Sequence, residues 1–236
     1  MRLQHKAAII TGASKGIGRA LALAYAQEGA SVVLAARSQD DLRSLEDQIL
    51  SSGGNAISVI CDVTDEENVK QMVKTSIDKF GDIDILVNNA GIGGFRPIYG
   101  IHLDNWNRML SVNLTSTFLC SKHVWKSMKR KGGGSIINMS SLSGTRAYPM
   151  YAAYAASKWG QIGFTKTAAE EGKPDKIRVN AIAPGKVDTP MREKVSEDKS
   201  KILRVEDCVG AAVFLGSDES EFITGQVIEI EWFGKE

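Results

Sequence analysis

Cysteine and proline are scarce in this sequence, with three cysteines and five prolines among 236 residues. Cys61, Cys120 and Cys208 form no Cys-x-x-Cys pair, which excludes a disulfide framework and favours three small residues in or near the core. The three histidines show no metal-ligand spacing, so we expect no metal site. No apolar run approaches the roughly 18 residues of a membrane helix, and no signal sequence is evident. We therefore expect a soluble, cytoplasmic protein.

Net charge is also nearly absent. Lys and Arg number 29 against 28 Asp and Glu, for a formal charge of +1, and only 7% of the residues are aromatic. Such a balance gives no reason to expect nucleic acid or a membrane surface as a partner. Hydrophobic residues, by contrast, make up 43% of the chain. A chain of this length can bury roughly 70 to 75% of its unfolded surface, and we expect one domain over residues 1–236.

Short apolar strands alternate with helical stripes along the whole chain. This alternation predicts an α/β fold in which right-handed crossovers build a parallel sheet. The predicted strands are 7–11, 31–36, 55–61, 83–87, 135–139, 177–183 and 226–231, and the predicted helices are about 17–25, 39–50, 69–80, 106–131, 150–171 and 205–215.

A glycine-rich turn, Thr11-Gly-Ala-Ser-Lys-Gly-Ile-Gly18, joins the first strand to the first helix. Its spacing differs from both the GxGxxG dinucleotide fingerprint and the phosphate loop. The physical basis is shared, because glycines let the backbone approach a phosphate and the helix N-terminus offers free N–H groups. The same turn would also serve as a tight connection only, so other motifs must decide.

Three further motifs accompany this turn: Asn88-Asn-Ala-Gly91, Tyr154-Ala-Ala-Ser-Lys158 and Pro184-Gly185. Together, in this order, they resemble the short-chain dehydrogenase/reductase family from Lys6 to about Ile230. The resemblance implies a Rossmann fold, with a doubly wound, seven-stranded parallel sheet and helices on both faces. It also implies a nicotinamide dinucleotide bound outside the carboxyl ends of the strands. A small-molecule carbonyl or alcohol substrate and a homodimer or homotetramer are implied as well.

Tyr154 and Lys158 lie four residues apart in a predicted helix, on one face and about 6 Å apart along its axis. A nearby ammonium lowers the pKa of a phenol from about 10, which lets the phenol give or take a proton. An ordinary amphipathic helix can carry such a pair, but its place in the family pattern favours catalysis. We interpret Tyr148 and Tyr151 as pocket walls or packing residues, because Pro149 disfavours helix before it and Tyr151 lies about 10 Å from Lys158.

Two more catalytic candidates come from the resemblance. Ser141 lies thirteen residues before Tyr154, the family spacing, with Ser140 and Ser143 as fallback positions. It follows the fifth strand, where a hydroxyl can hydrogen-bond a substrate carbonyl. Asn113 stands inside a predicted helix, where Asn is unfavourable. The resemblance implies that Asn113 holds a water that relays protons to the lysine; the alternative is a core asparagine bonded to backbone.

The end of the second strand bears on the choice of nicotinamide cofactor. NAD sites usually carry an acidic residue there, but this chain has no carboxylate until Asp40. Arg37 and Lys15 suit the 2′-phosphate of NADP(H), unless both are merely solvated cations. We expect Arg37→Asp to move preference toward NADH. The resemblance implies that Asp62 contacts the adenine ring.

The other cofactor assignments also follow from the resemblance. Asn88 and Gly91 are expected to line the cofactor, and Thr189 to hold the nicotinamide amide. The full set of expected cofactor residues is Gly12, Ser14, Lys15, Gly16, Ile17, Gly18, Arg37, Asp62, Val63, Asn89, Ala90, Gly91, Tyr154, Lys158, Pro184, Gly185, Val187 and Thr189.

These residues together predict an NADPH-dependent reductase of a ketone or 3-oxoacyl carbonyl, and the sequence looks most like the 3-oxoacyl-thioester reductases of the family. The alternatives are an NAD-dependent alcohol or sugar dehydrogenase and a non-catalytic dinucleotide sensor. The substrate-side segment 186–204 is short, which predicts an open site. Trp232 and Phe233 are interpreted either as part of an oligomer interface or as a cover for the sheet edge.

Overall fold

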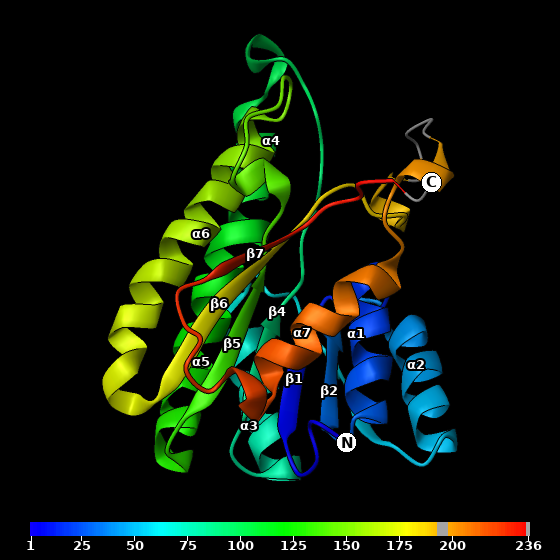
Figure 1. Ribbon diagram of the computed structural model, residues 1–236, viewed down its shortest axis with the longest axis vertical. Helices are drawn as coiled ribbons and strands as arrows, with labels where there is room; N and C mark the ends of the chain where they lie inside the picture. Colours follow the sequence, from blue (N-terminus) through cyan, green and yellow to red (C-terminus); the bar gives the residue numbers. More distant parts are fainter. Residues whose placement is uncertain (193–197, 235–236) are drawn as a thin grey trace.

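A computed structural model describes residues 1–192 and 198–234. Seven parallel strands form one sheet in the order β3-β2-β1-β4-β5-β6-β7 (Figure 1). Because the chain starts in the middle and winds first to one side and then to the other, the switch point lies between β1 and β4. The predicted fold class is confirmed. The strands are β1 (Ala7–Thr11), β2 (Ser31–Ala36), β3 (Asn55–Ile60), β4 (Ile85–Asn88), β5 (Gly134–Met139), β6 (Ile177–Pro184) and β7 (Val227–Ile230).

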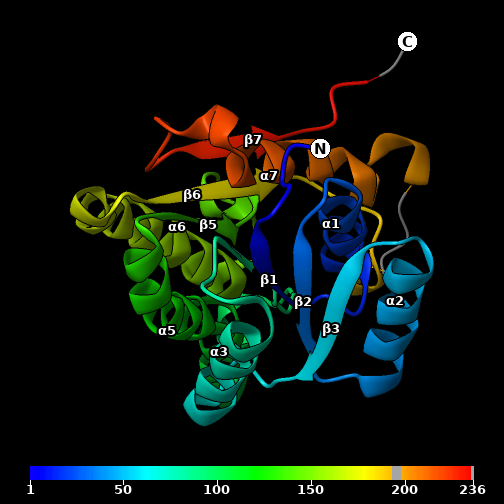
Figure 2. The same ribbon diagram turned by 90° about the horizontal axis from the view of Figure 1, so that it is seen from below.

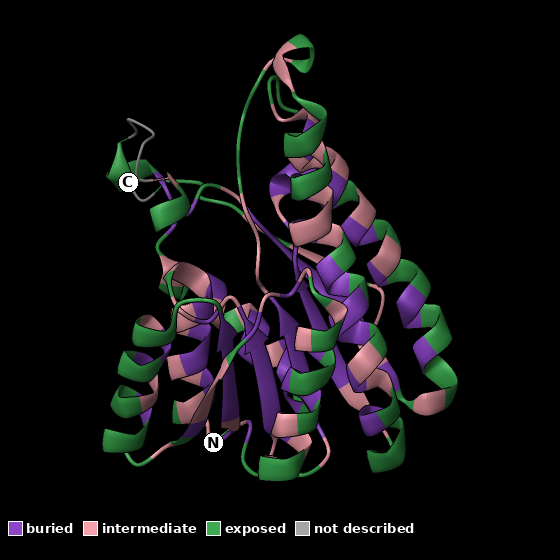
Figure 3. Cartoon of the chain, turned by 180° about the vertical axis from the view of Figure 1, so that it is seen from behind, coloured by how far each residue is buried: buried purple, intermediate pink, exposed green. Residues whose placement is uncertain are grey.

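Helices cover both faces of the sheet (Figure 2). On one face lie α1 (Gly16–Gln27), α2 (Gln39–Ser51) and α7 (Val209–Gly216), and on the other lie α3 (Glu66–Phe80), α5 (Ser116–Lys131) and α6 (Ala152–Gly172). The buried side of α2, for example, is an apolar stripe of Leu42, Leu45 and Ile49 that belongs to the core on its face of the sheet. The strands between the two helix layers are largely buried (Figure 3). The short 3₁₀ turns are Ile98–Gly100, Leu142–Gly144, Lys173–Asp175, Pro190–Arg192, Lys199–Lys201, Val205–Cys208 and Asp218–Ser220.

The predicted helix 106–131 differs from the structure in its regularity. It begins earlier, as α4 (Leu103–Leu110), and passes through a π-helical turn (Ser111–Thr115) before continuing as α5. Apolar periodicity does not reveal a single widened turn, because the stripe resumes on the next turn of helix. The widened turn contains Asn113, one of the catalytic candidates.

The cysteines agree with the sequence interpretation. All three are free and buried, and burial raises the pKa of the Cys61 thiol to about 11 and that of Cys208 to about 12. Among residues 1–192 and 198–234, no group of His, Cys, Asp or Glu is arranged to hold a metal ion. The same part of the chain contains no helix with the length and apolar character needed to cross a bilayer.

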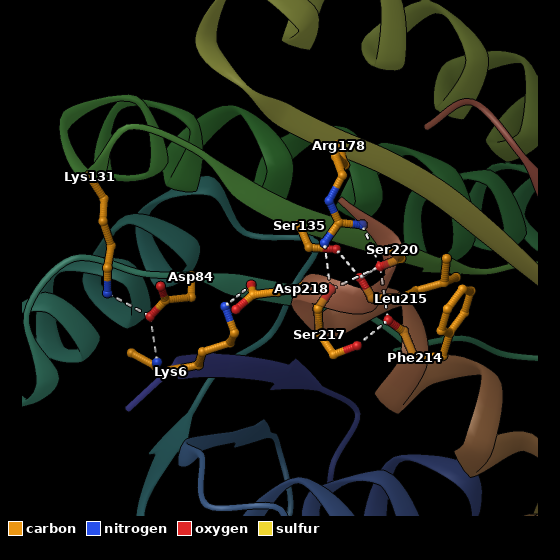
Figure 4. A network of polar contacts seen from close by, with 11 residues as sticks. Lys6, Asp84, Lys131, Ser135, Arg178, Phe214, Leu215, Ser217, Asp218 and Ser220 are labelled. Carbon is orange, nitrogen blue, oxygen red and sulfur yellow. Dashed lines mark hydrogen bonds and ion pairs between the residues drawn. The ribbon is translucent and has the colours of Figure 1, made fainter. Parts of the chain in front are cut away.

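A network of polar contacts ties together the amino ends of four strands (Figure 4). Arg178, at the start of β6, donates to the Ser220 hydroxyl at 2.9 Å and to the Ser217 carbonyl at 3.3 Å. The Ser135 hydroxyl in β5 donates to the Leu215 carbonyl at 2.7 Å. Asp84, before β4, accepts from Lys131 and from the backbone N–H of Ala7, both at 2.7 Å, and Lys6 pairs with Asp218. These contacts fasten α7 and its following turn to the sheet.

Candidate active site

The glycine turn lies at the opposite, carboxyl edge of the sheet, between β1 and α1. Gly12 and Gly16 have φ values of +66° and +56°, in the left-handed region that favours glycine. A Cβ on Gly18 would stand 2.2 Å from the Gly12 carbonyl oxygen and 2.4 Å from the amide nitrogen of Asn89. A side chain is therefore excluded at Gly18. The turn brings backbone to the N-terminus of α1, and this glycine cradle fits the phosphates of a dinucleotide.

The Asn-Asn-Ala-Gly motif after β4 holds this turn in place. Asn89 donates through its side-chain amide to the carbonyls of Thr11 at 2.9 Å and Gly12 at 3.2 Å. The Thr11 hydroxyl in return accepts the N–H groups of Asn89 and Ala90. Two motifs whose bonded residues are 77 positions apart in sequence thus form one hydrogen-bonded unit.

Asn88 behaves differently from its neighbour. Its side chain is buried and donates to Asn138 at 2.9 Å and to the Ser121 hydroxyl at 3.1 Å. The expectation that Asn88 lines a cofactor is therefore wrong. As the last residue of β4, it points into the helix layer that covers the sheet, and hydrogen bonds within the core satisfy it.

The Pro-Gly motif after β6 also reaches the glycine turn. The Thr189 methyl lies 3.4 Å from the position that a Cβ on Gly16 would occupy. Gly185 donates its N–H to the Ile230 carbonyl at 2.8 Å, which keeps the chain after Pro184 beside β7. Val187 is buried and pairs with Leu203 in an isolated bridge. Four expected cofactor residues, Pro184, Gly185, Val187 and Thr189, thus run from the end of β6 to the glycine turn, where Ser14 and Ile17 are partly exposed.

The cations expected to bind a 2′-phosphate lie at the same edge. Arg37 is exposed directly after β2. The ammonium of Lys15 lies 3.2 Å from the carboxylate of Asp41, in the first turn of α2, and both side chains are exposed. Sequence reasoning missed Asp41, because the contact depends on how the glycine turn packs against α2.

Asp62 and Val63 follow β3. Hydrogen bonds from the backbone N–H and then the hydroxyl of Thr64 lower the pKa of Asp62, and the charge of Arg37 adds a smaller effect. Asp62 therefore stays ionised near neutral pH, with Arg37 close enough to act on it. Val63 is buried.

Tyr154 and Lys158 stand on one face of α6, as their spacing predicts. The Lys158 side chain is only 4% exposed, and its ammonium lies 5.8 Å from the centre of the Tyr154 ring. It donates to the Met139 carbonyl at the end of β5, at 2.7 Å, and to Gln161 at 3.3 Å. Burial lowers the pKa of Lys158 to about 7, since a charged ammonium is costly away from water.

The expected effect on Tyr154 is wrong in its sign. The pKa of Tyr154 is raised, because loss of solvation at this partly buried position outweighs a side-chain hydrogen bond with Ser141, which lowers it. Tyr151 adds a smaller upward effect and Arg192 a downward one. The ammonium of Lys158 faces the ring and the Met139 carbonyl, which is why spacing alone gave the wrong direction. The phenol is therefore protonated at neutral pH.

The three candidate serines separate clearly. Ser140 is buried and donates to the Lys158 carbonyl at 3.2 Å, and Ser143 is also buried. Ser141 is partly exposed, accepts the N–H of Ser143 at 3.1 Å and shares a hydrogen bond with Tyr154. Of the three, Ser141 is the one whose hydroxyl lies beside the phenol, and the fallback positions are structural.

Asn113 is fully buried in the π-helical turn. Its amide donates to the Ile92 carbonyl and to the Ser157 hydroxyl, both at 3.0 Å, and its oxygen accepts the Ile92 N–H at 2.8 Å. The backbone contacts of the alternative interpretation are thus present. A Cβ on Gly91 would lie 3.4 Å from the Asn113 oxygen and 3.9 Å from the Lys158 ammonium, so these three residues meet at the end of β4.

Two side-chain hydroxyls form hydrogen bonds with carbonyls of the π-helical turn. The hydroxyl of Ser116 donates to the Val112 carbonyl at 2.6 Å, and that of Thr117 donates to the Asn113 carbonyl at 3.1 Å. Hydroxyls four residues further along therefore bind carbonyls whose regular helical bonds are disturbed. In the sequence, Ser116 and Thr117 after an out-of-place Asn are the only local signal of this irregularity.

Phe95 and Met191 are near the site but were not singled out in the sequence. Phe95 stacks on Tyr151 with centroids 6.1 Å apart. The Met191 sulfur lies 2.9 Å from the position of a Cβ on Gly93, so the segment after Thr189 touches the loop after β4. The adjacent Gly93 and Gly94 were the available sequence signal.

Two expectations concern the margins of the site. Of the segment 186–204, residues 193–197 lie outside the described residues; in the rest, Asp188 pairs with Lys199. Phe233 is 94% exposed, and Trp232 is also exposed. The interpretation of Phe233 as a cover for the sheet edge is therefore wrong for the chain by itself.

Comparisons with known proteins agree with this geometry. The family model described as short chain dehydrogenase matches residues 6–200. The chain is 40% identical over 241 residues to the 3-oxoacyl-[acyl-carrier-protein] reductase FabG of Thermotoga maritima, with 98% of each chain covered. It is 39% identical over 238 residues to the 3-oxoacyl-[acyl-carrier-protein] reductase of Synechocystis sp., with 97% of this chain and 96% of the relative covered.

Solved structures lead to the same family. A 7α-hydroxysteroid dehydrogenase complexed with NADH and 7-oxo glycochenodeoxycholic acid superposes with a TM-score of 0.95 at 32% identity, over 99% of this chain and 95% of that one. A short-chain type dehydrogenase/reductase from Mycobacterium marinum gives 0.93 at 35% identity, over 97% and 95%. The chain belongs to the short-chain dehydrogenase family and is an oxidoreductase that acts on CH–OH or C=O groups. Within that family it is similar to the 3-oxoacyl-[acyl-carrier-protein] reductases.

Proposed function

We propose that this protein reduces a ketone or 3-oxoacyl thioester to the alcohol with NADPH, and that Tyr154 is the proton donor. The observation that carries the proposal is the hydrogen bond between Tyr154 and Ser141, with the Lys158 amino nitrogen 5.8 Å from the centre of the Tyr154 ring and 3.9 Å from the position of a Cβ on Gly91. The nicotinamide, when bound, supplies a hydride to the carbonyl carbon. The chain itself supplies the proton and holds the oxygen.

Tyr154 gives its phenolic proton to the carbonyl oxygen as that oxygen gains charge. Its raised pKa keeps the phenol protonated at neutral pH, which is the state that carbonyl reduction needs, whereas oxidation of an alcohol needs the phenolate. Ser141 hydrogen-bonds the same oxygen and fixes its position. Lys158, whose pKa of about 7 leaves it protonated in about half of the molecules at neutral pH, holds its amino nitrogen 5.8 Å from the centre of the ring, and Asn113 fixes the loop at Ile92.

Replacement of the phenol tests the proton donor. In Tyr154→Phe, kcat/KM for NADPH-dependent carbonyl reduction should fall about 10² to 10⁴-fold, because general acid catalysis is lost. The dissociation constant for NADPH and the melting temperature should stay close to those of the parent. Tyr99→Phe, at a tyrosine that is 93% exposed, is the control and should keep its activity. A Tyr154→Phe enzyme with parental activity would leave the dinucleotide-sensing function as the better hypothesis.

The preference for NADPH is supported by Arg37 after β2 and Lys15 in the glycine turn. Arg37→Asp should weaken NADPH binding at least about tenfold and favour NADH, because an anion then faces the 2′-phosphate. Asp41→Asn should act oppositely, and tighten NADPH about two- to fivefold, because Lys15 is released from its ion pair. Fluorescence titration of both nucleotides measures the dissociation constants. Unchanged ratios in both variants would favour the NAD-dependent alcohol or sugar dehydrogenase.

Assembly and location belong to the same proposal. Phe118 on α5 and Trp159 on α6 are exposed, which supports a homodimer or homotetramer formed through these helices. Light scattering of the purified protein measures the number of chains per particle. Three free, buried cysteines support a reducing compartment such as the cytoplasm.

A further inference from the structure

Three aromatic side chains form a continuous surface that ends at Tyr154. Tyr151 is at its centre, with ring centroids 6.1 Å from those of Phe95, Tyr148 and Tyr154. Its ring stacks on Phe95 at 27° and meets Tyr154 edge to face at 67°. Phe95, Tyr148 and Tyr151 are called the aromatic wall below. The proposed proton transfer and cofactor binding do not use it, and from the sequence alone Tyr148 and Tyr151 are either pocket walls or packing residues.

The backbone around the wall is fixed by one hydrogen bond within a turn and one between two loops. Pro149 and Met150 occupy the centre of a turn closed by the Tyr151 N–H and the Tyr148 carbonyl at 3.4 Å. Met150 has a φ of +70°, in the left-handed region, which is unfavourable for a residue with a side chain. The Arg96 N–H donates to its carbonyl at 2.8 Å and joins the loop after β4 to this turn. Local strain that is held in place in this way is typical of functional sites.

The wall stays accessible although its rings are largely apolar. Phe95 is 51% exposed and Tyr148 is 41% exposed, and Tyr151 and Tyr154 are partly buried. The two loops lie together at the end of the molecule beyond α4 and α6 (Figures 1 and 3). An accessible apolar surface that begins one ring away from the proposed proton donor is placed to contact whatever is attached to the reacting carbonyl.

We propose that the aromatic wall selects carbonyl substrates that carry a flat ring next to the reacting group, and that Tyr151 is the residue that determines this specificity. The inference rests on the proposed carbonyl reduction and names its substrate class. A ring can stack on Tyr151 or meet its edge, as Phe95 and Tyr154 do. A straight chain of similar size touches the same surface but loses more rotational freedom on binding.

Two 3-oxo esters of one framework test this specificity: ethyl benzoylacetate, with a phenyl group on the ketone, and ethyl 3-oxohexanoate, with a propyl group. The ratio of their kcat/KM values is compared between the parent, Tyr151→Phe and Tyr151→Leu. The intrinsic reactivity of the two ketones cancels in this comparison. Tyr151→Phe keeps the ring, and Tyr151→Leu keeps only an apolar side chain.

The phenyl-to-propyl ratio should fall about three- to tenfold in Tyr151→Leu, mainly through KM for the phenyl ester, because one aromatic contact is lost. It should stay within about twofold of the parent in Tyr151→Phe. Melting temperature and NADPH affinity should be parental in both variants. An equal ratio in Tyr151→Leu and the parent would overturn the proposal, as would an equal fall in Tyr151→Phe.

Failure of the proposed function would give a different experimental result from failure of the specificity proposal. If the parent turns over neither ester, the reductase proposal fails, and the wall is then tested by binding. Calorimetry with the two esters should still give tighter binding of the phenyl ester to the parent than to Tyr151→Leu, with the propyl ester nearly unaffected. Equal binding of the phenyl ester to both proteins would overturn the specificity proposal independently of catalysis.

Discussion

The polar side chains at the two edges of the sheet differ in whether other groups of the chain satisfy them. At the amino edge, charged and hydroxyl side chains bind one another and the carbonyls of α7: Arg178 binds Ser217 and Ser220, and Asp84 binds Lys131 (Figure 4). At the carboxyl edge, polar groups such as Ser141 and Arg37 stay partly or fully exposed around a turn of glycines. Side chains that satisfy one another stabilise a fold, whereas those that face outward are available to a ligand.

The glycine turn tests this comparison most strongly, because it contributes both to the stability of the fold and to the proposed dinucleotide site. Gly18→Ala would place a Cβ 2.2 Å from the Gly12 carbonyl oxygen and should lower the free energy of unfolding by about 3 kcal/mol, in addition to weakening dinucleotide binding. Urea unfolding and NADPH titration measure the two effects. Gly163→Ala, at an open position of α6, is the control and should be neutral or stabilising by up to about 1 kcal/mol. Equal stability of the two variants would contradict the close packing of the turn.

The amino edge should carry stability without activity. Arg178→Met removes two hydrogen bonds from a charged, partly buried donor and should cost about 2 kcal/mol of unfolding free energy. Lys6→Met, which breaks the more exposed pair with Asp218, should cost about 0.5 kcal/mol or less. Both variants should keep the parental kcat/KM per folded molecule. A loss of activity in Arg178→Met at temperatures where it is folded would show that the two edges are coupled.

The last expected effect is a pH dependence at the carboxyl edge. Burial lowers the pKa of Lys158 from 10.5 to about 7, so between these values the unfolded chain binds more protons than the folded chain. Stability from this group therefore rises with pH in that window, by about 1 kcal/mol per unit. Lys158→Met lacks this contribution, so its stability relative to the cofactor-free parent should decline from pH 7.5 to 9.5. Parallel stability curves from urea unfolding would contradict the depressed pKa.

Local patterns in the sequence predicted much of the carboxyl edge. The glycine spacing marked the turn between β1 and α1, and the i,i+4 spacing placed Tyr154 and Lys158 on one helix face. Both depend on residues close together in the chain. The sign of the pKa shift of Tyr154 was not predictable in this way, because it depends on how much water the surrounding loops exclude.

Contacts between distant segments escaped the sequence reasoning. Ser135 and Leu215 are 80 residues apart, and nothing in either neighbourhood indicates their hydrogen bond. Asn88 and Asn89 are adjacent, yet one faces the core and the other the glycine turn, because β4 ends between them. The pairing of Lys15 with Asp41 likewise needs the packing of α2 against the turn.

The hydroxyls of Ser116 and Thr117 bind the carbonyls of Val112 and Asn113 from within the same helix. The Asn113 side chain, in contrast, binds Ile92 and Ser157 outside the π-helical turn. An engineer can therefore keep residues 111–117 and Ile92 fixed and exchange the loops 93–102 and 145–151 around them. Libraries confined to those two loops would vary which substrates can enter and would leave Asn113, Ser141, Tyr154 and Lys158 unchanged.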